Sequence, residues 1–60
     1  MNKREELRLK RIEQVFNNVK RLKGNFDKKE MVIEIMSSQE VTERKAKEYL
    51  MVAEHRWKNQ

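Results

Sequence analysis

The side chains of this sequence that can do specific chemistry are mainly cations. Arg4, Arg8 and Arg11 recur at spacings of four and three residues, which places them along one stripe of a helix. Guanidinium groups form bidentate hydrogen bonds with phosphate oxygens, so such a stripe can follow a phosphate backbone. The other interpretation is a solvated helix face, partly neutralised by the neighbouring Glu5 and Glu6. The sequence alone favours neither interpretation.

No constellation of residues predicts catalysis. His55 is the only histidine, and its nearest carboxylate along the chain, Glu54, points elsewhere on a helix. Ser37 and Ser38 fall in an expected turn with no base beside them. Cysteine is absent, which excludes disulfides and thiolate metal sites, and there is no glycine-rich phosphate loop. We therefore expect no enzyme activity, no cofactor and no metal ion.

Charge is the strongest bulk signal in the sequence. The chain has 15 Lys and Arg residues against 10 Asp and Glu residues, a formal net charge of +5. The excess is uneven, because residues 1–24 carry +5, residues 25–41 carry −2 and residues 42–60 carry +2. A basic surplus in so small a domain favours an anionic partner, most often nucleic acid. Solubility is the alternative explanation.

The elements that must position these residues are predicted to be three helices in a single domain of residues 1–60. Proline is absent, glycine occurs once, and no segment alternates apolar and polar residues over a strand length. The first helix is predicted over about residues 3–23, with a left-handed C-cap at Gly24. Residues 1–4 and 58–60 are expected to fray. The buried stripe of the first helix is predicted to be Leu9, Ile12, Phe16 and Val19, widened by Val15 and Leu22.

The second helix is predicted over about residues 28–38. Asp27 is a good N-cap, and Glu30 follows it at the capping-box spacing. Phe26 and Met31 are placed to form a hydrophobic staple across this start. Apolar residues lie almost all round the body of the helix, leaving only Glu30 and Glu34 as an exposed strip. This pattern predicts a central helix that is buried between two partners.

The third helix is predicted over about residues 42–57, after a turn at residues 37–40. Thr42 is its expected N-cap. Its core stripe is predicted to combine small residues, which permit close helix approach, with large ones that supply buried area. The stripe on the opposite side is basic and mostly polar. The core stripe is Ala46, Tyr49, Leu50, Ala53 and Trp57, and the opposite stripe is Arg44, Lys47, Met51, His55 and Lys58.

The start of the third helix carries a pattern of a valine, a Ser or Thr cap, an arginine, an alanine, a tyrosine and a leucine, found at Val41, Thr42, Arg44, Ala46, Tyr49 and Leu50. On this pattern the chain resembles, over about residues 28–55, the small tri-helical helix-turn-helix DNA-binding proteins common in archaea, their plasmids and viruses. The family usually has a glycine in the turn, where Glu40 stands here, and a small residue in the preceding helix, where Met36 stands here.

The resemblance implies an all-α, compact three-helix bundle with a helix-turn-helix from its second and third helices and no wing. It also implies that the start of the third helix enters the major groove of double-stranded DNA, as in a transcriptional regulator or a DNA-organising protein. Arg44 and Lys47 would be the main readers, whereas Glu43 and Glu48 on the same face oppose phosphate. The candidate DNA-binding residues are Thr42, Arg44, Lys45, Lys47 and Met51 in the third helix, with Arg4, Arg8 and Arg11 on phosphates.

Partner identity stays open between two classes. A homodimer is one expectation, since a single helix contacts few bases and the first helix or Trp57 could supply the dimer contact. The alternative function is a small accessory subunit that binds and stabilises a nucleic-acid enzyme, such as an archaeal DNA polymerase holoenzyme, within a nucleic-acid-processing complex. Met51, apolar on an exposed face, favours such a protein contact. We expect no membrane segment and a cytoplasmic location.

Overall fold

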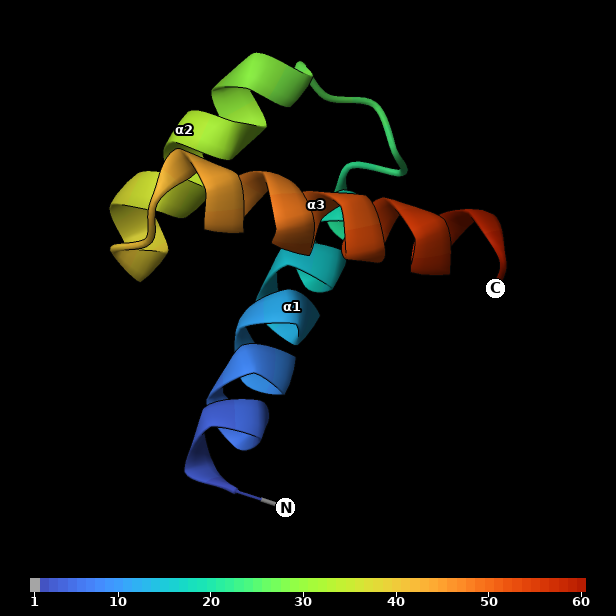
Figure 1. Ribbon diagram of the computed structural model, residues 1–60. Helices are drawn as coiled ribbons and strands as arrows, with labels where there is room; N and C mark the ends of the chain where they lie inside the picture. Colours follow the sequence, from blue (N-terminus) through green and yellow to red (C-terminus); the bar gives the residue numbers. More distant parts are fainter. Residues whose placement is uncertain (1) are drawn as a thin grey trace.

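The computed structural model describes residues 2–60 and has three α-helices: α1 at Lys3–Arg21, α2 at Lys28–Gln39 and α3 at Glu43–Lys58 (Figure 1). The predicted all-α three-helix fold is confirmed, and residues 2–60 contain no strand. No helix in this range is long and apolar enough to cross a membrane. The amino-terminal half of α1 projects away from the other helices (Figure 1), and all of residues 2–10 are exposed.

Each helix begins where a side chain replaces a missing hydrogen-bond acceptor. The acceptor is in each case the residue before the helix, and the donor is the backbone N–H three residues later, which is the geometry of an N-cap. This confirms the predicted caps of the second and third helices and adds one to the first. The three bonds run from Glu5 N to Asn2 Oδ1 (2.9 Å), from Glu30 N to Asp27 Oδ1 (3.1 Å) and from Lys45 N to Thr42 Oγ1 (3.3 Å).

The central helix is α3, not α2 as the sequence pattern predicts. It packs on both α1 and α2, which contact each other much less than each contacts α3. One face of α2 is therefore uncovered, and Ile33 is 59% exposed. Ala46 and Ala53 are fully buried where α3 crosses its neighbours, so the predicted close approach is confirmed. The core consists of Ile12, Val15, Phe16, Val19, Met31, Ile35, Ala46, Tyr49, Leu50 and Ala53.

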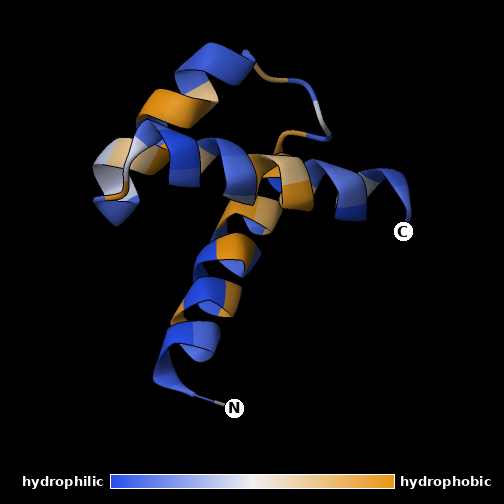
Figure 2. Cartoon of the chain, viewed as in Figure 1, coloured by the Kyte–Doolittle hydropathy of each residue, from blue (hydrophilic) through white to orange (hydrophobic). Residues whose placement is uncertain are grey.

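The hydrophobic stripe of α1 is shorter than predicted. Leu9 is 49% exposed, because α3 crosses α1 closer to its carboxyl end and leaves its first turns uncovered (Figure 1). Hydrophobic colours accordingly gather at the crossing of α1 and α3 and in the middle of α2, whereas the start of α1 is hydrophilic (Figure 2). The buried part of the stripe begins at Ile12.

The turn after α1 contains two residues with positive φ. Helix α1 ends two residues earlier than predicted, and Lys23 (φ 54°) precedes Gly24 (φ 76°) in the left-handed region. Hydrogen bonds from Lys23 N to the Lys20 carbonyl (3.0 Å) and from Gly24 N to the Val19 carbonyl (2.9 Å) form a Schellman motif. Gly24 also permits a close approach, since a Cβ atom there would lie 2.8 Å from Trp57 Nε1. Trp57 is thus half-buried within the single chain.

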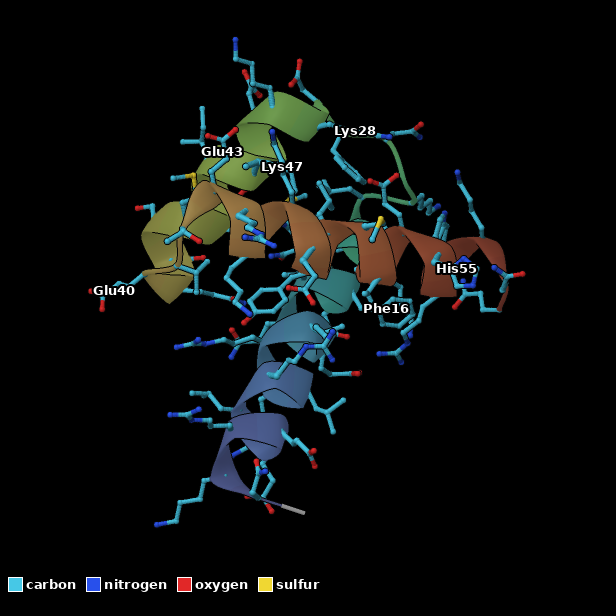
Figure 3. All side chains as sticks on the ribbon, in the orientation of Figure 1. Phe16, Lys28, Glu40, Glu43, Lys47 and His55 are labelled. Atoms are coloured by element: carbon cyan, nitrogen blue, oxygen red, sulfur yellow. The ribbon has the colours of Figure 1, made fainter. Side chains whose placement is uncertain are left out.

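The turn between α2 and α3 contains Glu40, which closes α2 in the left-handed conformation (φ 52°, ψ 47°). Its side chain projects outward from the molecule (Figure 3). A glycine would adopt this conformation without strain, so the turn has glycine-like geometry at the position where the sequence lacks a glycine. The fraying expected at residues 1–4 and 58–60 stays a prediction: Lys3, Arg4 and Lys58 are helical here, and Met1 lies outside the described residues.

Candidate nucleic-acid interface

Four of the eight predicted DNA-binding residues come together in one surface hollow between α1 and α3. The helical repeat places Arg4, Arg8 and Arg11 on one side of α1, and the crossing of α3 brings Lys45 beside them. Tyr49 is buried and forms the floor. We call this surface the α1–α3 hollow, and it is lined by Arg4, Leu7, Arg8, Arg11, Lys45 and Tyr49.

Glu48 is the acidic group at the edge of this hollow. Arg8 Nη2 lies 3.0 Å from Glu48 Oε1, and Lys45 Nζ lies 3.7 Å from Glu48 Oε2. The hydrogen bond from Arg8 is the largest cause that lowers the pKa of Glu48; desolvation opposes it, and the charges of Lys45 and Arg8 add to the lowering. Glu48 therefore stays ionised at neutral pH and joins α1 to α3. With four cations and this one carboxylate, the hollow and its edge carry a formal charge of +3.

Arg11 is held in place through its own backbone. The carbonyl oxygen of Arg11 accepts a hydrogen bond from Gln39 Nε2 (3.1 Å), and the same amide group donates to Gln14 Oε1 (3.2 Å). These bonds attach the carboxyl end of α2 to α1, directly before the turn that leads into α3. The arginine stripe of α1 and the start of α3 are thus fixed relative to each other.

The remaining predicted residues lie elsewhere on α3. Successive helical residues are about 100° apart, so Lys45 and Lys47 project to opposite sides of α3. Lys47 Nζ lies 2.9 Å from Glu43 Oε1, and this pair is on the side of α3 that faces α2 (Figure 3). The hydrogen bond from Lys47 and its charge lower the pKa of Glu43. Met51 also lines the α2 side.

Arg44 and Thr42 both lie at the start of α3, but Thr42 is engaged in a hydrogen bond with the backbone. Arg44 is exposed and lies on the ridge between the α1 side and the α2 side of the helix. Thr42 is exposed too, but its hydroxyl oxygen accepts the capping hydrogen bond from Lys45 N. Thr42 therefore has a structural role as the N-cap of α3, in addition to any contact it makes with a ligand.

Another cation of α3, Arg56, has a packing role. Its Nη1 lies 2.7 Å from Glu13 Oε2, and its guanidinium group lies 4.1 Å from the centre of the Phe16 ring. This cation–π contact and ion pair join the end of α3 to α1. Arg56 is thus a cation outside the α1–α3 hollow, on the other side of the helix crossing.

Sequence reasoning misses Leu7 and Tyr49 as parts of the hollow, and Lys28 and Lys29 as cations near α3. Tyr49 was identifiable only as a core residue, since its place beside the arginines depends on how α1 crosses α3. Lys28 and Lys29 belong to residues 25–41, and the net charge of −2 over that segment gives no indication of a basic surface there. Comparison with known proteins adds no assignment, because no family model, curated protein or solved structure matches the chain.

Proposed function

We propose that this chain binds double-stranded DNA through the α1–α3 hollow and the exposed start of α3, as a transcriptional regulator or a DNA-organising protein. The observation that carries the proposal is the gathering of Arg4, Arg8, Arg11 and Lys45 from two helices onto one surface. Arginine and lysine side chains in such an arrangement neutralise backbone phosphates and release counterions, which supplies most non-specific DNA affinity. Arg44 lies next to this surface and is the candidate for contact with a base edge.

Glu43 and Glu48 oppose DNA binding less than the sequence indicates. Glu48 is paired with Arg8 and Lys45, and Glu43 is paired with Lys47. Each carboxylate is therefore partly neutralised before DNA approaches. Lys47 and Met51 face α2, so the proposed interface no longer depends on them. The phosphate contacts would come from α1, and the groove contact from the first turn of α3.

The number of cations sets the expected salt dependence. The formal charge of +3 in the hollow, together with Arg44, corresponds to about four phosphates neutralised. At about 0.9 per phosphate, the logarithm of the affinity should fall with the logarithm of salt concentration with a slope of about −3.6. The affinity should then drop by a factor of about 150 between 50 and 200 mM salt.

A charge-matched pair of variants tests the proposal. In the first variant Arg4, Arg11 and Lys45 are changed to Gln, which removes three cations of the hollow and leaves the Arg8–Glu48 pair. The control changes three exposed α1 cations outside the hollow to Gln: Lys10, Lys20 and Arg21. Both have the same net charge. At 0.1 M salt the first variant should bind duplex DNA about 500-fold more weakly than the unaltered protein, and its logarithmic salt slope should be about −0.9.

The outcome separates the two functional classes. Equal losses in the two triple variants would show that binding follows net charge alone and would overturn the assigned surface. No binding of duplex DNA by the unaltered protein at about 10⁻⁵ M, where non-specific binding is expected, would overturn DNA binding by the free chain. It would favour the accessory-subunit alternative. Helicity by circular dichroism confirms that both variants fold.

A further inference from the structure

A second surface lies on the opposite side of α3 from the α1–α3 hollow. It is formed where α3 passes α2, and two adjoining depressions share Lys28, Val32 and Lys47. Apolar side chains from both helices line it, and two of them are largely exposed: Ile33 (59%) and Met51 (66%). We call this surface the α2–α3 groove, and its apolar residues are Val32, Ile33, Met36, Leu50 and Met51.

Lysines line the edges of this groove. Lys28 and Lys29 stand at the start of α2, and Lys47 and Lys58 follow α3. Two glutamates also line it, but each is already engaged: Glu43 with Lys47 at 2.9 Å (Figure 3) and Glu54 with Lys28 at 3.6 Å. Within residues 2–60, neither Lys29 nor Lys58 lies within 4 Å of a carboxylate oxygen. The groove therefore offers an apolar floor and two uncompensated cations at its edges.

We propose that the α2–α3 groove binds an acidic amphipathic helix of a partner protein. A groove between two helices with an apolar floor receives the apolar face of a third helix, whose anchors recur every three or four residues. Met36 and Met51 are unbranched and adapt to such a face. Glutamates or aspartates flanking the apolar anchors of the partner would then meet Lys29 and Lys58.

The charges argue against two other occupants. In the part of the chain that the structure describes, a second copy has one uncovered apolar helix stretch besides the groove, the start of α1 with Leu7 and Leu9. Residues 3–10 carry four basic and two acidic residues, so this stretch would bring further cations to the lysine edges. Duplex DNA would satisfy the lysines, but it offers no apolar surface for Ile33 and Met51. An acidic helix satisfies both parts of the groove.

The groove acts independently of the DNA interface. The two surfaces lie on opposite sides of α3, since the α1 side carries Lys45 and the α2 side carries Lys47. DNA and the partner helix can therefore bind together. Substitution of Ile33 should leave the salt slope of DNA binding unchanged, and loss of DNA binding in the hollow variants should leave the groove intact. Failure of one proposal is thus distinguishable from failure of the other.

The test is a titration of the ¹⁵N-labelled full chain with synthetic peptides of about five helical turns. The probe peptide has Leu at helix-spaced positions and Glu on both flanks. One control has the same apolar positions with Lys in place of Glu, and another has the probe composition in scrambled order. We expect saturable amide shifts at residues 28–36 and 47–58 with the probe peptide and with neither control peptide. Ile33→Lys and Met51→Lys should each weaken binding about tenfold or more.

Other outcomes overturn the proposal. Equal binding of the Lys peptide or the scrambled peptide would refute an acidic amphipathic partner, as would shifts confined to the α1–α3 hollow. A dimer in sedimentation velocity that dissociates in Ile33→Lys would show that a second copy occupies the groove. Glu34→Gln is the charge-matched control, because it raises the net charge by one, as Ile33→Lys does, and Glu34 is exposed on α2 and does not line the groove. It should retain the affinity of the unaltered chain for the probe.

Discussion

Glu48→Gln is the most informative single substitution, because it should strengthen DNA binding while it removes a native interaction. The carboxylate of Glu48 engages Arg8 at 3.0 Å and Lys45 at 3.7 Å. Glutamine keeps the size of the side chain but has no charge. The substitution therefore raises the formal charge of the hollow and its edge from +3 to +4 and frees both cations for phosphate.

The size of the effect follows from counterion release. One additional phosphate neutralised steepens the logarithmic salt slope by about 0.9, from about −3.6 to about −4.5. If the two proteins bind equally at 1 M salt, where the electrostatic contribution vanishes, the variant should bind about eightfold more tightly at 0.1 M. The melting temperature should change little, since ion pairs between exposed side chains contribute little to stability.

The assay is fluorescence anisotropy of labelled duplex DNA at four or more salt concentrations. The control is Glu13→Gln, which causes the same change in net charge but removes the partner of Arg56, outside the hollow. The control should keep the slope of the unaltered protein. Weaker binding by Glu48→Gln, or equal steepening in both variants, would refute the assignment of the hollow as the phosphate-binding surface.

Three further predictions concern the turns and the acid range. Gly24→Ala should destabilise the fold by about 1–2 kcal/mol, because φ is left-handed there and the added Cβ would lie 2.8 Å from Trp57 Nε1. Thermal unfolding followed by Trp57 fluorescence measures this loss of stability, and an unchanged melting temperature would contradict the prediction. Glu40→Gly should stabilise the fold by about 0.5–1 kcal/mol, since φ is 52° there; denaturant unfolding checks this, and a loss of stability would contradict it. The pKa values of Glu43 and Glu48 are lowered in the folded state, so their ion pairs stabilise the fold above about pH 4.5, and this contribution is lost as pH falls through the lowered values. The melting temperature of the double Gln variant should therefore fall less below pH 4.5 than that of the unaltered protein. An identical pH profile of the two melting temperatures would contradict this.

The sequence predicts the helices and their starts well because these depend on local chemistry. Asp27 and Thr42 cap α2 and α3 through a side-chain oxygen that needs only the backbone three residues ahead. Ala46 and Ala53 are buried as predicted, since small residues at helical spacing mark a close crossing. Such features require no knowledge of where the other helices lie.

The local patterns in the sequence do not predict how the three helices are arranged. An apolar pattern all round α2 predicts burial on two sides, but α3 takes the central place and Ile33 is exposed. The same arrangement divides the predicted DNA-binding residues, because α1 lies beside Lys45 and α2 lies beside Lys47. A helical wheel of α3 shows one exposed face, and only the positions of α1 and α2 reveal that this face borders two different surfaces.

The measurement that tests the central claim most directly is binding of the unaltered protein to labelled duplex DNA of random sequence. Anisotropy would be recorded across salt concentrations from 50 to 200 mM. DNA binding through the α1–α3 hollow predicts saturable binding with a logarithmic salt slope of about −3.6. Absence of binding at about 10⁻⁵ M protein, or binding that does not weaken with salt, would contradict it.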